Sequence, residues 1–334
     1  MQIIRLTSFL LLIAGPAFAQ SPKGAEFLPG WPGTNRARTA LRDFDERPGG
    51  VDAEIRGYLD ATVEDGPREK LLQSTVELDL FGSSTYGKEQ QKQWAVGGEY
   101  FVTTLDSVDP RFPNSLSDIW IAVAGDLYDS GSFRFSGSIG VVNASDRPLS
   151  DGDGIYPIVN LLFEWRTSEK GSWILLVNYT TSRPGLPEVP LPAIGYRRQV
   201  SDHFEWFLGL PYLYWRWEPP DSPWDFHFGG MPIVDFEAEL GFSFNQHWRI
   251  FARYDTENRN FHVDGTDSDE RFGYEDMVAT LGVEFMPREK MRLSVEGGWV
   301  FGREFSRETL SGSELEEFTV EGSGVVMFRF SFDF

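Results

Sequence analysis

The sequence predicts an all-β protein that folds as a transmembrane, antiparallel, up-and-down β-barrel, and three observations carry the prediction. From about Leu71 onward, apolar and polar residues alternate with the period of two that is typical of strands. The alternating segments have about the 9–11 residues that a tilted strand needs to cross a bilayer. The connections between them alternate between short and long, as in membrane barrels with short turns at one end.

Segment 234–244 is the clearest alternating strand. Its apolar face consists of Val234, Phe236, Ala238, Leu240, Phe242 and Phe244, and its polar face of Asp235, Glu237, Glu239, Gly241 and Ser243. Segments 172–182, 291–301 and 131–141 repeat the pattern. The polar faces carry charges in mid-strand and the apolar faces carry aromatics near their ends, which favours lipid outside and a polar lumen inside. A soluble periplasmic β-sandwich is the alternative, because its strands also alternate.

The connections set the expected number of strands. The short ones are expected at 129–131, 168–171, 201–203, 245–247 and 287–290, and the long ones at 105–117, 144–156, 183–192, 218–232, 259–275 and 304–321. The strand with the weakest alternation is the first, at 52–63. It is needed to bring both termini of the barrel to the periplasmic side. The count is 14 strands, with 12 as the alternative.

The first 52 residues differ from the rest. Residues 1–19 combine Arg5, an apolar stretch and a small-x-small triplet, which predicts a cleaved signal peptide. Residues 20–52 are rich in Pro and Gly, and predict either a disordered periplasmic lead-in or a plug. The barrel is expected to occupy 53–334.

Composition excludes several functions. With 51 acidic against 30 basic residues, the net charge is -21, which disfavours nucleic acid as a partner. The chain has no Cys, so it has neither disulfides nor thiolate metal sites. The four His fall in expected turns and loops, without a catalytic arrangement around them. We therefore expect no enzyme activity, no cofactor and no metal.

The polar faces of the expected strands define the lumen, where acids outnumber bases. The candidate pore-lining residues are Asp235, Glu237, Glu239, Arg249, Arg253, Asp255, Arg292, Glu296 and Arg329. A lumen that holds water and excess negative charge would favour cations. If the acids and bases pair across the lumen instead, the interior is a sealed, salt-bridged core.

The chain ends in VVMFRFSFDF, with Val326, Phe328, Phe330, Phe332 and Phe334 on one face and Arg329, Ser331 and Asp333 on the other. This ending, the signal peptide and the alternating strands resemble Gram-negative outer-membrane β-barrel proteins, and segment 191–217 resembles an uncharacterised family of them. The resemblance implies an outer-membrane location with a periplasmic C-terminus. It also implies a barrel-assembly signal at Phe328, Phe330, Phe332 and Phe334 that the barrel-assembly machinery recognises.

The expected function is porin-like passage or binding of small solutes through an acidic, cation-favouring lumen. One alternative is a structural or surface-interaction barrel without an open pore, whose acidic loops contact membrane lipid and lipopolysaccharide. The soluble β-sandwich is the second alternative.

Overall fold

The computed structural model describes residues 49–63, 70–86, 92–107, 109–150, 152, 154–183, 186, 188–231 and 235–333. The expected signal peptide, residues 20–48 of the lead-in and Phe334 lie outside the described residues, so the expectations for them stay predictions. No helix that is long and apolar enough to cross a membrane occurs in the described part of the chain.

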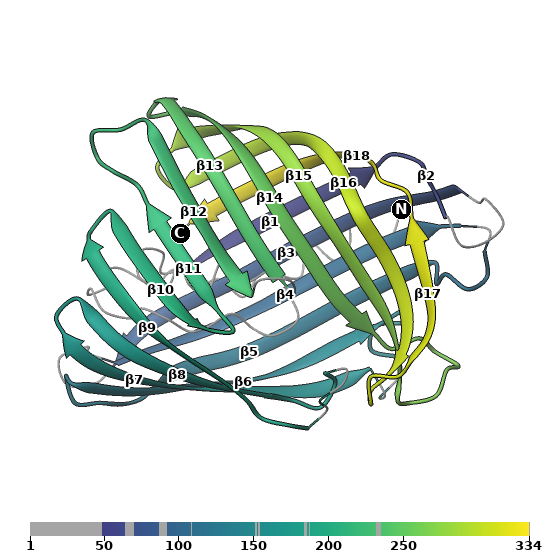
Figure 1. Cartoon of the computed structure of the whole chain (residues 1–334), viewed down its shortest axis with the longest axis horizontal. Coiled ribbons are helices and arrows are strands. Elements are labelled where there is room, and N and C mark those ends of the chain that lie inside the picture. Colours follow the sequence, from purple (N-terminus) through teal and green to yellow (C-terminus); the bar gives the residue numbers. More distant parts are fainter. Residues whose placement is uncertain are drawn as a thin grey trace.

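All the regular elements of the described residues are strands, and each pairs antiparallel with its neighbours (Figure 1). Their bounds are β1 Gly49–Tyr58, β2 Ala61–Thr62, β3 Lys70–Tyr86, β4 Lys92–Asp106, β5 Ser115–Asp129, β6 Phe133–Ser145, β7 Ile155–Ser168, β8 Gly171–Thr180, β9 Leu191–Ser201, β10 Phe204–Leu210, β11 Leu213–Trp217, β12 Trp224–Met231, β13 Asp235–Asn245, β14 Trp248–Phe261, β15 Glu270–Arg288, β16 Met291–Thr309, β17 Glu314–Val320 and β18 Ser323–Asp333.

The sheet closes on itself because the last strand pairs with the first. The β18–β1 ladder runs from Gly50 opposite Asp333 to Tyr58 opposite Val325. β2 continues β1, and β17 continues β18 along β16. The described residues therefore form a closed antiparallel barrel of 16 strands, which confirms the fold class. Both described ends lie at one rim, which we call the turn rim; the opposite end is the loop rim.

The expected count of 14 strands, and the alternative of 12, are wrong for a local reason. Segment 204–217 alternates like one long strand, but it folds back after Leu210 into the hairpin of β10 and β11. The expected long loop 218–232 contains β12, which pairs with β11 and β13. Two strands were therefore missed in one region. The expected loop 304–321 is likewise mostly strand, because β16 and β17 extend into it.

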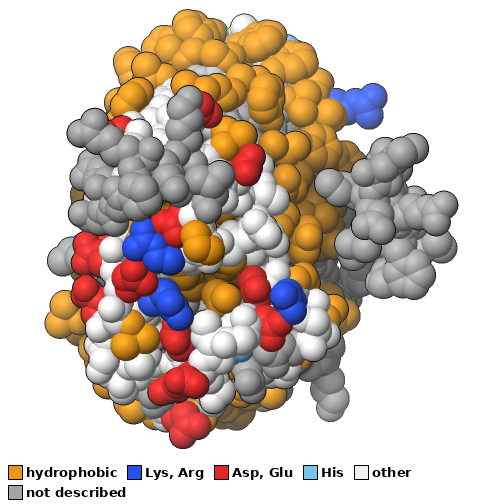
Figure 2. Space-filling view, turned by 90° about the vertical axis from the view of Figure 1, so that its right-hand side faces the viewer, with side chains coloured by type: hydrophobic (Ala, Val, Ile, Leu, Met, Phe, Trp, Pro, Cys, Tyr) orange, Lys and Arg blue, Asp and Glu red, His pale blue; other side chains and the backbone are white. Residues whose placement is uncertain are grey.

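Apolar residues face outward and polar residues face the interior along most of the wall. On β18, Phe328 is 54% exposed, whereas Arg329 on the other face bonds Glu54 inside the barrel. Figure 2, which views the loop rim, shows hydrophobic side chains along the flanks and charged side chains gathered on the end face. An apolar outer surface of this extent is what a barrel in hydrocarbon requires, and closure pairs the first strand with the last.

The barrel narrows toward the loop rim. At the ends of β6 and β14, His262 donates its backbone N–H to the Ala144 carbonyl at 3.0 Å and accepts from the Asp146 N–H at 3.1 Å. These two strands are not neighbours in the sheet. The loop-rim level is therefore bounded by β2 to β6 and β14 to β17. Of the strands between them, β7 reaches the same level, because its Ile155 lies opposite Asn143, whereas β8 to β12 end lower down (Figure 1).

Inward-facing apolar residues fill this narrow end. We call them the apolar seal: Ala61, Val63, Leu71, Phe101, Leu105, Phe112, Leu116, Val142, Ala144, Ile158, Phe261, Phe272, Tyr274, Phe305, Phe318 and Val320. Phe112, from the loop between β4 and β5, packs edge-on against Phe305 with ring centroids 5.2 Å apart. The loop-rim end of the described barrel is therefore lined by buried apolar side chains that pack against one another.

Candidate functional site

Below the apolar seal, the interior carries a continuous series of ion pairs, which we call the charge ladder. It consists of Asp225, Arg249, Glu239, Arg253, Glu296, Arg329, Glu54, Arg56, Glu257 and Arg259. Its members occupy alternate positions on β1, β12, β13, β14, β16 and β18. The period of two thus puts every one of these charges on the inner face.

Arg249 joins two strands at the first step of the ladder. Its Nε donates to Asp225 Oδ2 at 2.9 Å and its Nη2 donates to Glu239 Oε1 at 2.6 Å. Gly241, opposite Asp225 on β13, makes room for this guanidinium, because a Cβ there would overlap it. The absence of a side chain at residue 241 therefore positions the arginine between its two carboxylates.

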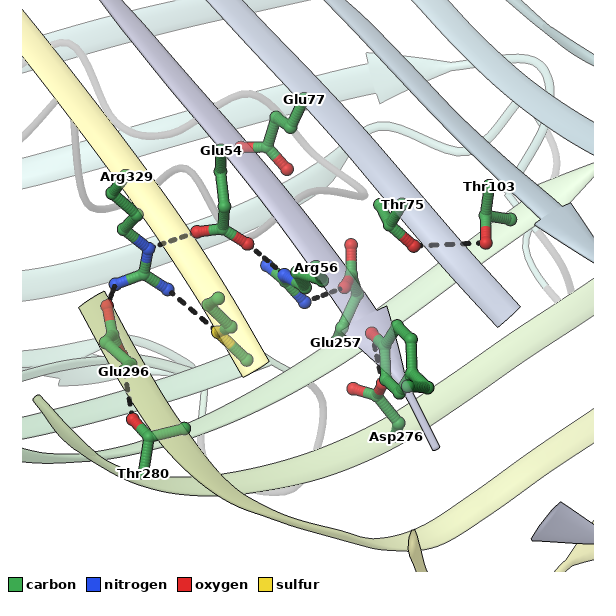
Figure 3. A network of polar contacts seen from close by, with 12 residues as sticks. Glu54, Arg56, Thr75, Glu77, Thr103, Glu257, Asp276, Thr280, Glu296 and Arg329 are labelled. Carbon is green, nitrogen blue, oxygen red and sulfur yellow. Dashed lines mark hydrogen bonds and ion pairs between the residues drawn. The ribbon is translucent and has the colours of Figure 1, made fainter. Parts of the chain in front are cut away.

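The middle of the ladder passes from β14 to β18. Arg253 donates from Nε to Glu239 Oε2 at 2.7 Å, and its Nη1 lies 3.4 Å from Glu296 Oε1. The same Glu296 oxygen lies 3.0 Å from Arg329 Nη1, and its other oxygen accepts from Thr280 at 2.8 Å. Glu296 is thus shared by two guanidiniums. Figure 3 shows Arg329, Glu296 and Thr280 pointing toward one another.

The last steps cross the lumen. Arg329 and Arg56 both bond Glu54, and Arg56 Nη1 donates to Glu257 Oε2 at 2.6 Å (Figure 3). Glu257 also accepts from Arg259 Nε at 2.5 Å. These contacts connect β1 and β18 to β14 through the interior rather than along the sheet.

Arg259 then reaches the opposite wall. Its Nη1 lies 3.1 Å from Glu99 Oε1 and 3.4 Å from Asp118 Oδ2, and its Nη2 lies 3.4 Å from Glu77 Oε2. Its guanidinium also lies 3.6 Å from the Phe101 ring centre, a cation–π contact. One buried cation therefore ties β14 to β3, β4 and β5, just below the apolar seal.

A second polar cluster lies near the turn rim on β5, β6 and β7. Arg134 Nε lies 3.2 Å from Asp129 Oδ2, and Arg166 Nη2 lies 2.9 Å from the same oxygen. Ser136 donates to Asp126 at 2.7 Å. Arg166 is partly exposed and Arg134 is buried. This end of the lumen is therefore polar and more accessible than the seal.

One group could hold a divalent cation. The ligand atoms of Asp225, His227 and Glu239 lie within 4.8 Å of one another, and His227 Nε2 is 3.4 Å from Glu237 Oε1. Oxygen and imidazole ligands suit several divalent metals. Arg249, however, pairs with both Asp225 and Glu239, so a metal ion would have to compete with a guanidinium.

The structure brings together most of the expected pore-lining residues. Glu237, Glu239, Arg249 and Arg253 lie in or beside the ladder, and so do Glu296 and Arg329. Asp255 is buried on the inner face of β14. Arg292 is half-buried on β16, where it pairs in register with Ser331 of β18. Asp235 is described only by its backbone pairing with Met231.

Several members of the ladder were missed from the sequence. Glu54, Arg56 and Arg259 were not among the residues expected to face the lumen, and Asp225 and His227 were expected in a loop. Alternation was the usable signal for Glu54 and Arg56, because Ile55 between them faces outward. For His227 it was the order Asp-x-His, which puts Asp225 and His227 on one face of a strand.

The expected assembly row lies on the outer face of β18. Phe328 and Phe332 are exposed at 54% and 40%, Phe330 is half-buried, and Phe334 lies outside the described residues. The opposite face carries Arg329, bonded to Glu54, and Ser331, which donates to Asp52. The alternation along the last strand is therefore real, and whether the row is an assembly signal is still a prediction.

At the loop rim, a polar clamp covers the seal. Arg111 donates to Asp109 from Nη2 at 2.6 Å and to Glu316 of β17 from Nη1 at 2.8 Å. Its guanidinium lies 4.6 Å from the Phe318 ring centre. The hydrogen bonds from Arg111 hold the pKa of the Asp109 carboxyl below its usual range.

No protein-family model and no curated protein matches the chain. Among solved structures, it is similar to OpdQ of Pseudomonas aeruginosa, with 8% identity over 86% of this chain and 99% of that one and a TM-score of 0.37. A COG4313 outer membrane channel from Pseudomonas putida F1 has 9% identity, coverage of 95% and 100%, and a TM-score of 0.36. The KdgM porin in complex with disordered oligogalacturonate has 7% identity, coverage of 85% and 99%, and a TM-score of 0.27. The strand pairing itself, rather than these similarities, establishes the closed barrel.

Proposed function

We propose that the chain is a porin-like outer-membrane barrel that takes small solutes, preferentially cations, into its lumen, and that it transports rather than catalyses. An exported chain, a cleaved signal peptide at 1–19 and a periplasmic turn rim belong to this proposal. The apolar outer face of the closed barrel supports a membrane location.

The charge ladder is the observation that carries the proposal. Burying ion pairs costs desolvation, and replacing them by apolar residues is often neutral or stabilising. The apolar seal supports this argument, because there the chain fills the interior with apolar side chains. The charged side chains in the wider part of the lumen are therefore best explained by a polar solute that binds them in place of their ion-pair partners.

The preference for cations rests on the group around β12 and β13. Asp225, Glu237 and Glu239 supply three carboxylates there, and Arg249 and Arg253 supply two guanidiniums. A small excess of fixed negative charge raises the local concentration of cations.

A closed structural barrel is the second candidate, because a specific observation favours it. Arg56 and Arg259 bridge the lumen, and the apolar seal fills the end above them. In this candidate, the exposed acidic loops contact lipopolysaccharide through divalent cations, and the row on β18 serves only recognition by the assembly machinery.

Recording from the refolded protein in planar bilayers separates the two candidates. Under a KCl gradient, the transport proposal expects discrete conductance steps and a reversal potential on the cation-selective side. Absence of conductance over many insertions would reject it in favour of the closed barrel. The same recording on a chain that begins at residue 49 tests whether the preceding residues restrict the current.

A further inference from the structure

The wall of the barrel is uneven in height. β10, β11 and β12 have 7, 5 and 8 residues, whereas β15 and β16 have 19 each. A tilted strand needs about 9–11 residues to cross the hydrocarbon layer. We call β10, β11 and β12 the low wall, because none of the three is long enough to cross it.

The low wall ends well below the loop rim. The β10–β11 ladder stops at Leu208 opposite Leu213, and the Gly209 N–H closes the turn by bonding the Tyr212 carbonyl at 3.0 Å. Among the described residues, the β13–β14 ladder stops at Glu237 opposite Asp255, yet β14 continues to Phe261. In Figure 1, the β10–β11 hairpin and β12 end near the middle of the barrel, while β14 to β17 reach its right-hand end.

Both faces of the low wall are apolar near its upper edge. On the outer face, Leu208 and Leu210 are 56% and 77% exposed. On the inner face, Phe207 packs against Leu162 and Ile174, with Tyr212 and Tyr214 against the same cluster. Beside its residues of the apolar seal, the inner face of the tall wall, which we define as β14 to β16, carries buried Asp276, Thr280, Glu296 and Arg303.

Straight passage along the axis meets the apolar seal, whose side chains are buried. The charge ladder, by contrast, continues onto the low wall, because Asp225 and His227 lie on β12. A molecule at the ladder therefore has polar partners beside it and an apolar surface toward the upper edge of the low wall.

We propose that the lumen communicates sideways with the hydrocarbon layer over the low wall, and that the transported solute is a small amphipathic cation. Its charged group pairs with Glu237 and Glu239, and its apolar part lies against Phe207 and Tyr214 and leaves over the edge. This inference rests on the proposed transport function and names its route and solute class.

Contact with lipid can be measured directly, because the chain has no Cys and accepts single labels. Tyr214→Cys on the inner face of the low wall, Thr280→Cys on the inner face of the tall wall and Leu208→Cys on the outer face are each labelled with bimane before refolding. Vesicles of phosphatidylcholine brominated in its acyl chains then serve as the quencher. Heat-modifiable migration on gels checks that each labelled barrel has folded, and Tyr212→Cys replaces Tyr214→Cys if the latter does not fold.

The label at residue 214 is expected to lose at least half as much fluorescence as the label at residue 208, and the label at residue 280 is expected to lose none. Equal protection at residues 214 and 280 would overturn the sideways route. If the barrel conducts cations but the label at residue 214 is not quenched by the brominated lipid, the sideways route is rejected and the transport proposal stands. Quenching at residue 214 without conductance rejects ion passage and supports the route.

The solute class has its own test in unbrominated vesicles. Dodecyltrimethylammonium is expected to change the fluorescence of the label at residue 214 at a concentration at least ten-fold lower than dodecyl sulfate, and Glu237→Gln is expected to reduce that difference. Equal potency of the two amphiphiles would reject a cationic solute.

Discussion

Arg56 on β1 donates a hydrogen bond to Glu257 on β14 at 2.6 Å, although these strands are not neighbours in the wall. Both side chains are only 1% exposed. Two walls of the barrel therefore lie close enough at this level for side chains to meet. The ion pairs that cross the lumen hold the barrel in this narrowed shape, and the first prediction follows from them.

Replacing Arg259 by Met should destabilise the barrel strongly. It would leave Glu77, Glu99, Asp118 and Glu257 without this cation in a buried position. Breaking a buried pair by removing one partner costs about 3–5 kcal/mol. The free energy of unfolding in urea, measured in vesicles, checks this value.

Arg166→Met is the matched control, because Arg166 is 28% exposed near the turn rim. Pairs accessible to solvent contribute about 0–1 kcal/mol, so this variant should lose little stability. Equal losses for the two variants would contradict a special role for the pairs that cross the lumen.

Replacing Phe112 by Ala should open the apolar seal. Phe112 packs against Phe272, Phe305 and Phe318, and truncating a buried Phe costs about 3–5 kcal/mol and leaves a cavity. We expect a several-fold rise in single-channel conductance over the wild type. Ile121→Ala, at a residue that is 63% exposed on the outer face, should leave conductance unchanged; an equal rise there would mean that the effect does not come from the seal.

The clamp at the loop rim should make stability depend on pH. Because the pKa of Asp109 is lowered in the folded protein, its stabilisation is complete above the pKa of the unfolded carboxyl, about 3.9, and is lost as pH falls through the folded value. Unfolding midpoints of the wild type and Asp109→Asn should therefore differ at pH 7 and converge as the pH drops below 4. A difference that persists unchanged at pH 2 would refute this linkage.

Replacing Phe334 by Asp, or deleting it, should impair insertion into the outer membrane. The last strand closes the barrel through its ladder with β1, and Phe334 follows Phe328, Phe330 and Phe332 in the sequence at the same spacing of two. The amount of heat-modifiable protein in outer-membrane fractions measures insertion. Asp333→Asn is the control, because it keeps the aromatic row; normal insertion of Phe334→Asp would show that the row is not an assembly signal.

The hairpin of β10 and β11 is a case in which the alternation pattern of the sequence did not reveal a turn. Apolar residues at Phe204, Trp206 and Leu208 face one side, and after the turn the same face continues at Trp215 and Trp217. The shift from even to odd positions, together with Pro211, was the available signal. It was missed because a two-residue turn interrupts the alternation so briefly that the segment resembles one strand.

The charge ladder illustrates a different limit. Alternation places Glu239, Arg253 and Glu296 on the inner faces of three strands, and this much was predictable. Which carboxylate meets which guanidinium depends on the strand register and on how far the barrel narrows. A bulge adds to the uncertainty, because Gly302 adopts φ 59 on β16 and shifts its register against β15.

Local chemistry alone decides that this chain forms strands, which face of each strand meets lipid and that the last strand ends in an apolar row. A period of two is set by the backbone, so it is present in the sequence before any contact forms. The tertiary structure decides the strand number, the low wall, the apolar seal and the ion pairs across the lumen. Those features join residues such as Arg56 and Glu257, 201 positions apart, whose distance depends on how the closed sheet is curved and narrowed.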